Sequence, residues 1–387
     1  MWLDKPRNPN APLAGLKVVE LARVLAGPWA GQILADLGAD VIKVESPDGD
    51  GTRKWGPPWV EREGPDGEVR REAAYYHATN RGKRSIVADF GDAGNLARVK
   101  AMISGADVVL ENFKTGSLAK FDLDYASLSA SNPRLVYCSI TGFGQTGPRA
   151  HEAGYDFVIQ GMSGFMALTG EPAGQPMKMG ISISDLTCGL YGVIGIQAAL
   201  AMRERTGRGQ HVDMALLDCS VGLLASQALH YLTTGTNPPR MGNEHAQVSA
   251  YGVFPTRDDP VILAPANDGL FRKLLKVLGR DDLLGEPRFA TNEARIANRA
   301  ELDAMIAAET AKHDRAQLLE QCHEHGIPAG PIHAIDQVFA DPQVVARGMQ
   351  VELGELPGVR SPFTFSEAEL ALDRPSPMLG EDDPARG

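Results

Sequence analysis

Short apolar runs rich in β-branched residues alternate with helical segments through the first third of the chain. Strand-like runs lie at 16–22, 40–45, 83–90, 107–113 and 134–144, and segments with helical spacing lie between them at 27–39 and 94–106. This alternation predicts parallel strands joined by crossover helices, and therefore an α/β fold.

The chain of 387 residues is too long for one ordinary core, so we expect more than one domain. A helix is expected at 187–205, and a strand followed by a long helix at 211–235. The segment "TNPPRMGNE" (236–244) then indicates a boundary. A second unit follows over 250–330, with a hairpin and three helices, before a Pro-rich, strand-poor tail. The polar loop 46–72 is long enough to be functional or interfacial.

Composition limits the kinds of partner and the cellular compartment that we expect for this protein. A net charge of -11 argues against nucleic acid and anionic membranes, so an anionic ligand must meet local cations. No signal peptide or membrane span is expected, and a cytoplasmic location follows. The four widely spaced cysteines, which include no CxxC pair, are expected to be small buried residues: Cys138, Cys188, Cys219 and Cys322.

The segment 21–45 resembles a dinucleotide-binding unit in outline, as a strand, a turn, a helix and a second strand. The fingerprint G-x-G-x-x-G is absent, because only Gly27 and Gly31 are present and Pro28 occupies the expected first helical turn. An NAD-dependent dehydrogenase therefore stays an alternative on fold grounds alone.

Two groups of cations are candidates for binding an anion such as phosphate. Arg81, Lys83 and Arg84 lie close together, although a solvated basic turn would look the same. Lys114 and Lys120 follow a predicted strand, where ligands of open parallel sheets bind.

Asp185 lies in "MGISISDLTCGLYG", between a strand-like run and an apolar helix. It is either a helix N-cap, which stabilises a helix by about 1 kcal/mol, or a carboxylate nucleophile for an activated acyl group. A nucleophile would also need backbone N–H groups near the oxyanion. The residues alone leave both open.

Eight segments in order resemble the class III CoA-transferases, which include formyl-CoA and carnitine CoA-transferases. They cover nearly the whole chain: "PLAGLKVVELARVLAGPWAGQILADLGADVIKVESPDGDGTRKWGPP", "NRGKRSIVADF", "ADVVLENFKTGSLAK", "YCSITGFGQTGP", "AGYDFVIQGMSG", "ISISDLTCGLYG", "TGRGQHVDMALLD" and "IPAGPIHAIDQVFADPQVVARGM".

The resemblance implies that Asp185 is the nucleophile, acting through an aspartyl anhydride and an aspartyl-CoA thioester. It implies CoA or acyl-CoA as a substrate, with no metal and no permanently bound cofactor. The implied CoA contacts are Leu25, Ala26, Ala88, Asn112, Phe113, Lys114, Lys120 and Tyr155. Ser46 replaces an arginine that often serves the nucleotide phosphates, so Lys83, Arg84 or Arg53 is expected to take its place.

The resemblance also implies a doubly wound, Rossmann-like large domain, a small α/β domain, and a homodimer of interlocked rings. The expected large domain covers 1–225, with a linker at 226–249, the small domain at 250–328, and a return to the large domain over 329–387.

"RVLAGPWAG", "GDGTRKWGPPWV" and "SITGFGQTGP" resemble the branch that uses succinyl-CoA with dicarboxylic acceptors such as glutarate. A second carboxylate needs a cation, and the candidates are Arg53, Arg23, Arg240 and His245. The alternatives are a 2-methylacyl-CoA racemase, whose family places a histidine where Tyr155 stands, and a non-catalytic acyl-CoA-binding protein.

Overall fold

The structure is a computed structural model that describes residues 2–64 and 67–384. The chain divides into two compact units. Unit 1 contains 1–166, 178–236 and 342–387, and unit 2 contains 167–177 and 237–341. Unit 1 is therefore built from both ends of the chain. The predicted boundaries at 225, 249 and 328 differ from these because residues 226–236 stay with unit 1 and 329–341 with unit 2.

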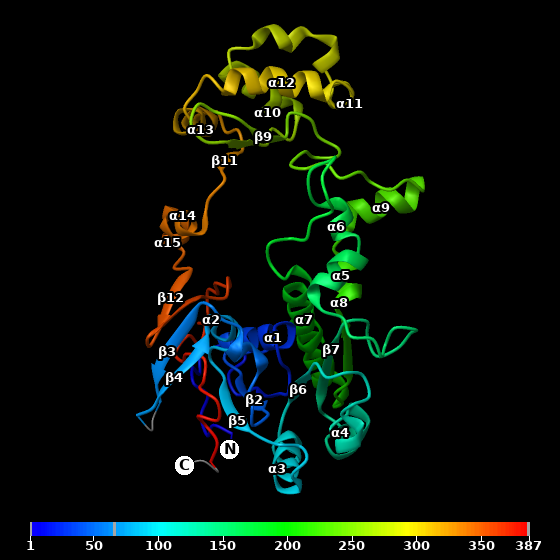
Figure 1. The fold of residues 1–387 in the computed structure, drawn as a ribbon, viewed down its shortest axis with the longest axis vertical. Helices are drawn as coiled ribbons and strands as arrows, with labels where there is room; N and C mark the ends of the chain where they lie inside the picture. The colour runs from blue at the N-terminus through cyan, green and yellow to red at the C-terminus, as the bar shows by residue number, and fades with distance from the viewer. Residues whose placement is uncertain (1, 65–66, 385–387) are drawn as a thin grey trace. The chain divides into compact units, whose positions relative to one another are not determined.

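Unit 1 is organised around a six-stranded parallel sheet (Figure 1). The strand order is β5-β2-β1-β6-β7-β8, and every neighbouring pair is parallel. The predicted parallel α/β sheet is thus confirmed. The order reverses between β1 and β6, which makes the carboxyl ends of these two strands the expected place for a ligand. The strands are β1 Lys17–Glu20, β2 Asp40–Glu45, β5 Arg84–Val87, β6 Val108–Glu111, β7 Val136–Thr141 and β8 His211–Ala215.

Helices cover both faces of the sheet. α1 and α7 contribute to a core on one face, and α3 and α4 to a core on the other. All four cysteines are free and buried, as expected. The helices of these layers and of the segments beside them are α1 Ala26–Asp36, α2 Ala74–His77, α3 Ala93–Ser104, α4 Tyr125–Ser131, α5 Asp156–Met162, α6 Phe165–Leu168, α7 Ile183–Thr206, α8 Leu216–Gly222 and α9 Ala225–Thr234.

Helix α7 begins four residues before the predicted start. Among the helices of the described residues, it alone is long and apolar enough to cross a membrane by length and composition. A helix of a protein core can have the same length and composition, so the expectation of no membrane span stays a prediction. Part of α7 lies in the sheet core, through residues such as Cys188 and Ile196, and part is exposed, as at Ile194.

The long segment 46–72 is not a plain loop. A short 3-10 helix, Gly51–Lys54, is followed by an antiparallel hairpin of β3 Trp59–Glu63 and β4 Val69–Ala73. Strand β3 reads "WVERE" and alternates exposed and half-buried residues, which explains why no apolar run marks it.

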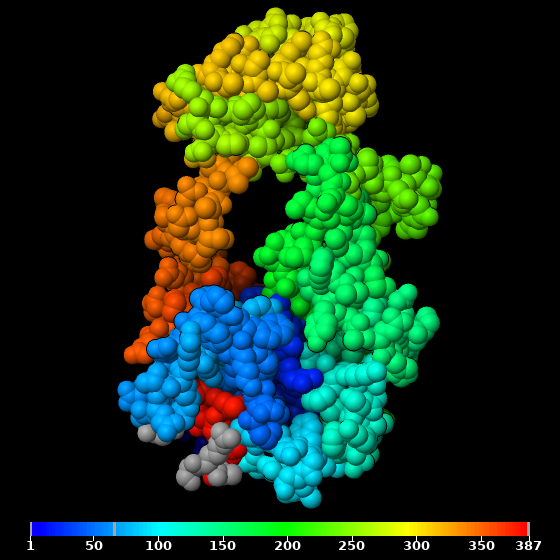
Figure 2. Space-filling model, viewed as in Figure 1, coloured from blue at the N-terminus to red at the C-terminus, as the bar shows by residue number. Residues whose placement is uncertain are grey.

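The end of the chain returns to unit 1. β12 Gln350–Leu353 and β13 Leu356–Val359 form a hairpin, preceded by α15 Pro342–Ala346. The extended segment beyond it runs beside β5, where Asp382 binds the backbone of Ser85 at 3.0 Å. Figure 2 shows this C-terminal segment in red among the blue and cyan residues of the same unit.

Unit 2 contains the antiparallel sheet β11-β10-β9 and the helices of a separate core. The predicted hairpin is present as β9 and β10. Its elements are β9 Gly252–Phe254, β10 Val261–Leu263, α10 Asp268–Val277, α11 Asn292–Ala297, α12 Arg299–Thr310, α13 Arg315–Glu324, β11 Ala329–Pro331 and α14 Ile335–Ala340.

Candidate active site

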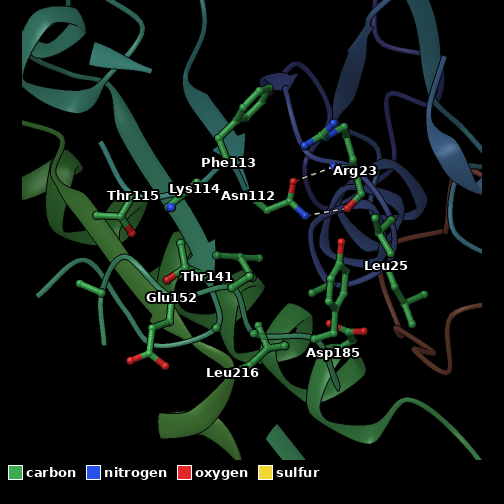
Figure 3. Close-up of a pocket in the computed structure, with 18 residues that line it drawn as sticks. Arg23, Leu25, Asn112, Phe113, Lys114, Thr115, Thr141, Glu152, Asp185 and Leu216 are labelled. Atoms are coloured by element: carbon green, nitrogen blue, oxygen red, sulfur yellow. Dashed lines mark hydrogen bonds between the residues drawn. The ribbon is translucent and has the colours of Figure 1, made fainter. Parts of the chain in front are cut away.

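A pocket opens at the carboxyl ends of β1 and β6, where the strand order reverses (Figure 3). It brings together eight of the predicted site residues, from the β1–α1 turn, the segment after β6, the start of α5 and the start of α7. These residues are Arg23, Leu25, Ala26, Asn112, Phe113, Lys114, Tyr155 and Asp185.

The Asn112 side chain joins the two strand ends. Its Oδ1 accepts the backbone N–H of Arg23 at 2.8 Å, and its Nδ2 donates to the carbonyl of Arg23 at 2.6 Å (Figure 3). Because one amide bonds both backbone groups of Arg23, it fixes the β1–α1 turn against the segment after β6. Asn112 therefore shapes the pocket wall.

Asp185 is the third residue of α7, and Ser182 is the N-cap residue. Of the two alternatives for Asp185, the N-cap is therefore wrong, because the helix begins two residues earlier, at Ile183. Within the described residues, the Asp185 carboxylate has no hydrogen-bond partner. It is half-buried and lines the pocket, and no cation in the part of the chain that the structure describes pairs with it.

Burial and a second carboxylate shape the acidity of Asp185. Burial is the larger cause and the nearby Asp156 carboxylate the smaller, and together they raise the pKa of Asp185 from 3.8 to about 7. Asp156 itself is held by the backbone N–H of Ser184 and the side chain of Gln160. A carboxylate whose pKa is raised to about 7 is more basic than an ordinary aspartate carboxylate, and this higher basicity suits a nucleophile.

Close packing of α7 on α1 sets the distance across the pocket. A Cβ at Gly189, one turn after Asp185, would lie 2.6 Å from the carbonyl oxygen of Ala26. Only glycine lets the two helices approach this closely, so Gly189 helps to hold Asp185 opposite the first turn of α1.

A second pocket adjoins the first, and both are lined by Arg23 and Phe113. Three aromatic rings face it, with Phe90 and Phe113 stacked at 6.2 Å between centroids. Such rings suit a flat base. Its lining includes Ser46, Ala88, Phe90, Phe113 and Phe121. Predicted Lys120 lies beside it, with its ammonium 4.7 Å from the Phe121 ring centroid.

Lys83 and Arg84 are not in either pocket. Lys83 is fully buried, and its ammonium binds Glu20 at 2.8 Å. The Arg84 guanidinium binds Asp40 at 2.6 Å. The prediction that they bind phosphate disagrees with this geometry, because each cation is already neutralised by a carboxylate from the sheet.

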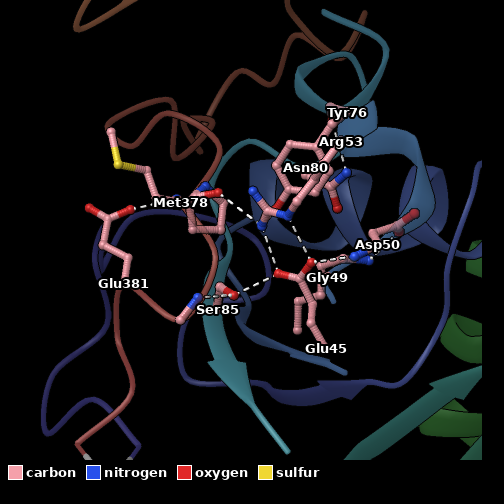
Figure 4. Close-up of polar contacts among 12 residues, drawn as sticks. Glu45, Gly49, Asp50, Arg53, Tyr76, Asn80, Ser85, Met378 and Glu381 are labelled. Atoms are coloured by element: carbon pink, nitrogen blue, oxygen red, sulfur yellow. Dashed lines mark hydrogen bonds and ion pairs between the residues drawn. The ribbon is translucent and has the colours of Figure 1, made fainter. Parts of the chain in front are cut away.

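Arg53 is likewise a structural residue (Figure 4). Its guanidinium binds Glu45 at 2.7 Å and also pairs with Glu72, and the residue is only 5% exposed. The predictions that Arg53 binds a phosphate or a substrate carboxylate were therefore wrong. The cause is the neighbouring acids, which were not visible from the charge of the segment.

Arg240 and His245 belong to unit 2. The Arg240 guanidinium donates to the carbonyls of Glu171 at 3.0 Å and Gly174 at 2.6 Å. The ring of His245 packs against Tyr251, 5.2 Å between centroids. Neutral carbonyls leave the positive charge of Arg240 uncompensated.

The structure adds Tyr75 and Asp156 to the surroundings of Asp185. Burial raises the pKa of the Tyr75 hydroxyl, and the charge of Asp185 raises it further. Tyr75 was not singled out from the sequence, where "AAYYH" carries no motif, because its proximity to Asp185 arises only from the fold.

Comparison with known proteins shows the family of the chain. The model of CoA-transferase family III matches residues 13–383. Succinate–glutarate CoA-transferase of Agrobacterium fabrum is 55% identical, covering 98% of this chain and 95% of that protein. Succinyl-CoA:glutarate CoA-transferase of Mus musculus is 37% identical, covering 98% and 87%. The crystal structure of a CAIB/BAIF family protein from Brucella suis superposes with a TM-score of 0.88 at 56% identity, covering 97% and 98%. This chain belongs to CoA-transferase family III.

Proposed function

We propose that this protein transfers CoA from succinyl-CoA to a dicarboxylic acid such as glutarate. The observation that carries the proposal is the 55% identity, over nearly the whole chain, to a succinate–glutarate CoA-transferase. The pocket supports it, because it places one uncompensated carboxylate, Asp185, at the ligand-binding edge of the sheet.

Asp185 acts as the nucleophile. Its ionised carboxylate attacks the carbonyl carbon of the succinyl thioester and the C–S bond breaks. CoA departs as the thiolate, and an aspartyl–succinyl anhydride is formed on the enzyme. The thiolate then attacks the aspartyl carbonyl, which releases succinate and leaves an aspartyl-CoA thioester. The acceptor carboxylate attacks this thioester, and the thiolate finally attacks the acceptor acyl group. Asp185 is regenerated and the new acyl-CoA leaves.

The two adjoining pockets divide the acyl-CoA between them. The thioester lies against Asp185, Leu25 and Ala26, and the nucleotide lies among the aromatic rings of the second pocket. Arg23 lines both pockets, shares the second with Ser46, and stacks its guanidinium 5.1 Å from the Phe113 ring centroid. We propose Arg23 as the cation that serves the CoA phosphates in place of an arginine at Ser46.

Arg240 or His245 binds the second carboxylate of the acid. Arg240 has the stronger support, because its neighbours are carbonyl oxygens and its charge remains available. Replacing Arg240 with Ala then raises the KM for glutarate far more than the KM for a monocarboxylate. Equal effects on both acids would contradict this role.

The protein works as a homodimer of interlocked rings. Unit 1 is assembled from both ends of the chain, which a threaded dimer would explain. Large apolar side chains are exposed on α7 and α9, including Ile194, Leu229 and Leu232 at 62%, 61% and 76% exposure. An exposed apolar surface of this kind marks an interface. Light scattering of the purified protein should give twice the mass of the chain, and a monomer would contradict the proposal.

A CoA-transfer assay tests the function directly. Succinyl-CoA is offered with a panel of mono- and dicarboxylic acids to wild type and Asp185→Ala. Transfer to dicarboxylates by wild type alone supports the proposal. Transfer by the variant would remove Asp185 from the mechanism. Exchange of the α-proton of a 2-methylacyl-CoA without transfer would instead indicate a racemase.

A further inference from the structure

The turn between β1 and α1 forms the wall of the pocket that contains Asp185. Arg23, Val24, Leu25 and Ala26 all line this pocket. Across residues 2–64 and 67–384, no side chain caps α1, so the first backbone N–H groups of this helix are left for another partner. N–H groups in such a place can stabilise an oxyanion formed at Asp185. The exact position of the turn therefore matters for the reaction.

Val24 holds this turn in an unfavourable backbone conformation. Its φ is 72°, in the left-handed region that β-branched residues rarely enter. A residue persists there only when its surroundings impose the conformation, and such strain is concentrated at functional sites. The contacts of Val24 and its neighbours should therefore show what imposes it.

Two buried side chains, those of Asp50 and Lys43, bind backbone groups of the turn at and before Val24. The Asp50 carboxylate accepts the backbone N–H of Val24 at 3.2 Å. The Lys43 ammonium donates to the carbonyl of Ala22 at 2.8 Å and pairs with Asp50 at 3.0 Å. Lys43 is fully buried and Asp50 is 1% exposed. Figure 4 shows Asp50 beside the Glu45–Arg53 pair, with its own N–H bound to Glu45.

The pair stays charged in spite of its burial. Burial by itself lowers the pKa of Lys43, but the carboxylates of Glu20 and Asp50 outweigh it and raise that pKa above its ordinary value. Burial raises the pKa of Asp50, but the Lys43 ammonium and the hydrogen bonds from Thr52 together outweigh burial and lower that pKa. A buried charge pair contributes little net stability compared with apolar packing. Because both members of the Lys43–Asp50 pair bind the backbone of the β1–α1 turn, the pair is better explained by a role in fixing the position of that turn.

We propose that Asp50 is a positioning residue for transfer at Asp185. Held and kept charged by Lys43, its carboxylate fixes the Val24 N–H and so sets the turn that lines the pocket with Asp185. This role rests on the proposed CoA-transferase function. Asp50 also lies at the edge of the second pocket, so a direct contact with substrate would appear in KM, whereas positioning appears in kcat.

The test compares Asp50→Asn with Asp36→Asn. Asp36 is also a buried, ion-paired carboxylate, bound to Arg81 at 2.6 Å, but it lies at the far end of α1. For Asp50→Asn we expect kcat to fall about 30- to 100-fold with the KM for succinyl-CoA within about threefold, since a displacement near 1 Å can cost about 10²-fold. For Asp36→Asn, kcat stays within about threefold of wild type in folded protein.

A second substitution tests the route through Val24. Glycine adopts a positive φ without steric cost, so adding Val24→Gly to Asp50→Asn should restore kcat by about tenfold. If Asp50→Asn does not fold, Asp50→Glu keeps the charge beside Lys43 but displaces the oxygens from the Val24 N–H. It must then show the same loss of kcat.

The outcomes separate the two proposals. An active wild type with an equally active Asp50→Asn or Asp50→Glu overturns the role of Asp50 alone. A loss confined to KM, or an equal loss of kcat in Asp36→Asn, also overturns it. A wild type without any CoA transfer overturns the proposed function, and the role of Asp50 with it.

Discussion

Replacing Asp185 with asparagine should abolish transfer and stabilise the folded protein. The carboxylate is half-buried, has a second carboxylate nearby, and has no hydrogen-bond partner among the described residues. Its ionised form therefore costs the folded state free energy. Asparagine has nearly the same shape and no charge, so it removes this cost along with the nucleophile.

The size of the effect follows from the pKa of Asp185, which is about 7 in the folded protein against 3.8 for an ordinary aspartate. Because the folded pKa is raised, the cost is absent below pH 3.8, grows between pH 3.8 and about 7, and is complete above about 7. At about 1.4 kcal/mol for each pH unit, it reaches about 2 kcal/mol at pH 5 and about 4 kcal/mol at pH 8.

Urea unfolding of wild type and Asp185→Asn at pH 5 and pH 8 measures this difference. The free energy of unfolding of the variant should exceed that of wild type at both pH values, and by more at pH 8. Asp36→Asn is the control, because it breaks a buried ion pair with Arg81 and should lower the free energy of unfolding by about 3 kcal/mol or more. A gain for Asp185→Asn that is the same at both pH values, or a loss at pH 8, would refute the reasoning.

Three further predictions concern the same pocket. Asp156→Asn removes the second carboxylate and lowers the pKa of Asp185, so the acid limb of the kcat/KM profile should move to lower pH; an unmoved limb would count against this coupling. Gly189→Ala should destabilise by about 1–3 kcal/mol and lower kcat, because its Cβ meets Ala26; Gly222→Ala, with no atom within 4 Å, should change little in a melting experiment. Arg23→Ala should raise the KM for succinyl-CoA and leave that for the acceptor acid unchanged, and the reverse would contradict the phosphate role.

The parallel sheet could be predicted because its signal is local. Buried strands such as β6, which reads "VVLE", are short runs dominated by apolar residues, and the helices between them have their own periodicity. The β3–β4 hairpin could not be predicted, because its strands are partly exposed and rich in charged residues and therefore form no apolar run. The order of the strands depends on pairing between segments that are distant in the sequence, so it cannot be predicted from any one segment. The same is true of the ligand-binding edge, which the strand order determines.

The site was predicted in part, for a related reason. Lys114, which follows a strand, and Asp185, near the start of a helix, were identified from their place in the pattern, whereas Asn112 and Phe113 were identified only through the resemblance to the class III CoA-transferases. Cations were misjudged because sequence shows a charge but not its partner. Arg53 meets Glu45, and Lys83 meets Glu20 63 residues away, only after the sheet forms. Tyr75 and Asp156 approach Asp185 through the same tertiary packing.

The central claim is that Asp185 becomes covalently bonded during transfer. The most direct measurement is peptide mass spectrometry of the protein incubated with succinyl-CoA and quenched with hydroxylamine, which converts an activated aspartyl group to a hydroxamate. We predict a hydroxamate at Asp185 in protein incubated with succinyl-CoA and quenched with hydroxylamine. The hydroxamate should be absent when either succinyl-CoA or hydroxylamine is omitted. Efficient CoA transfer with an unmodified Asp185 would contradict the account.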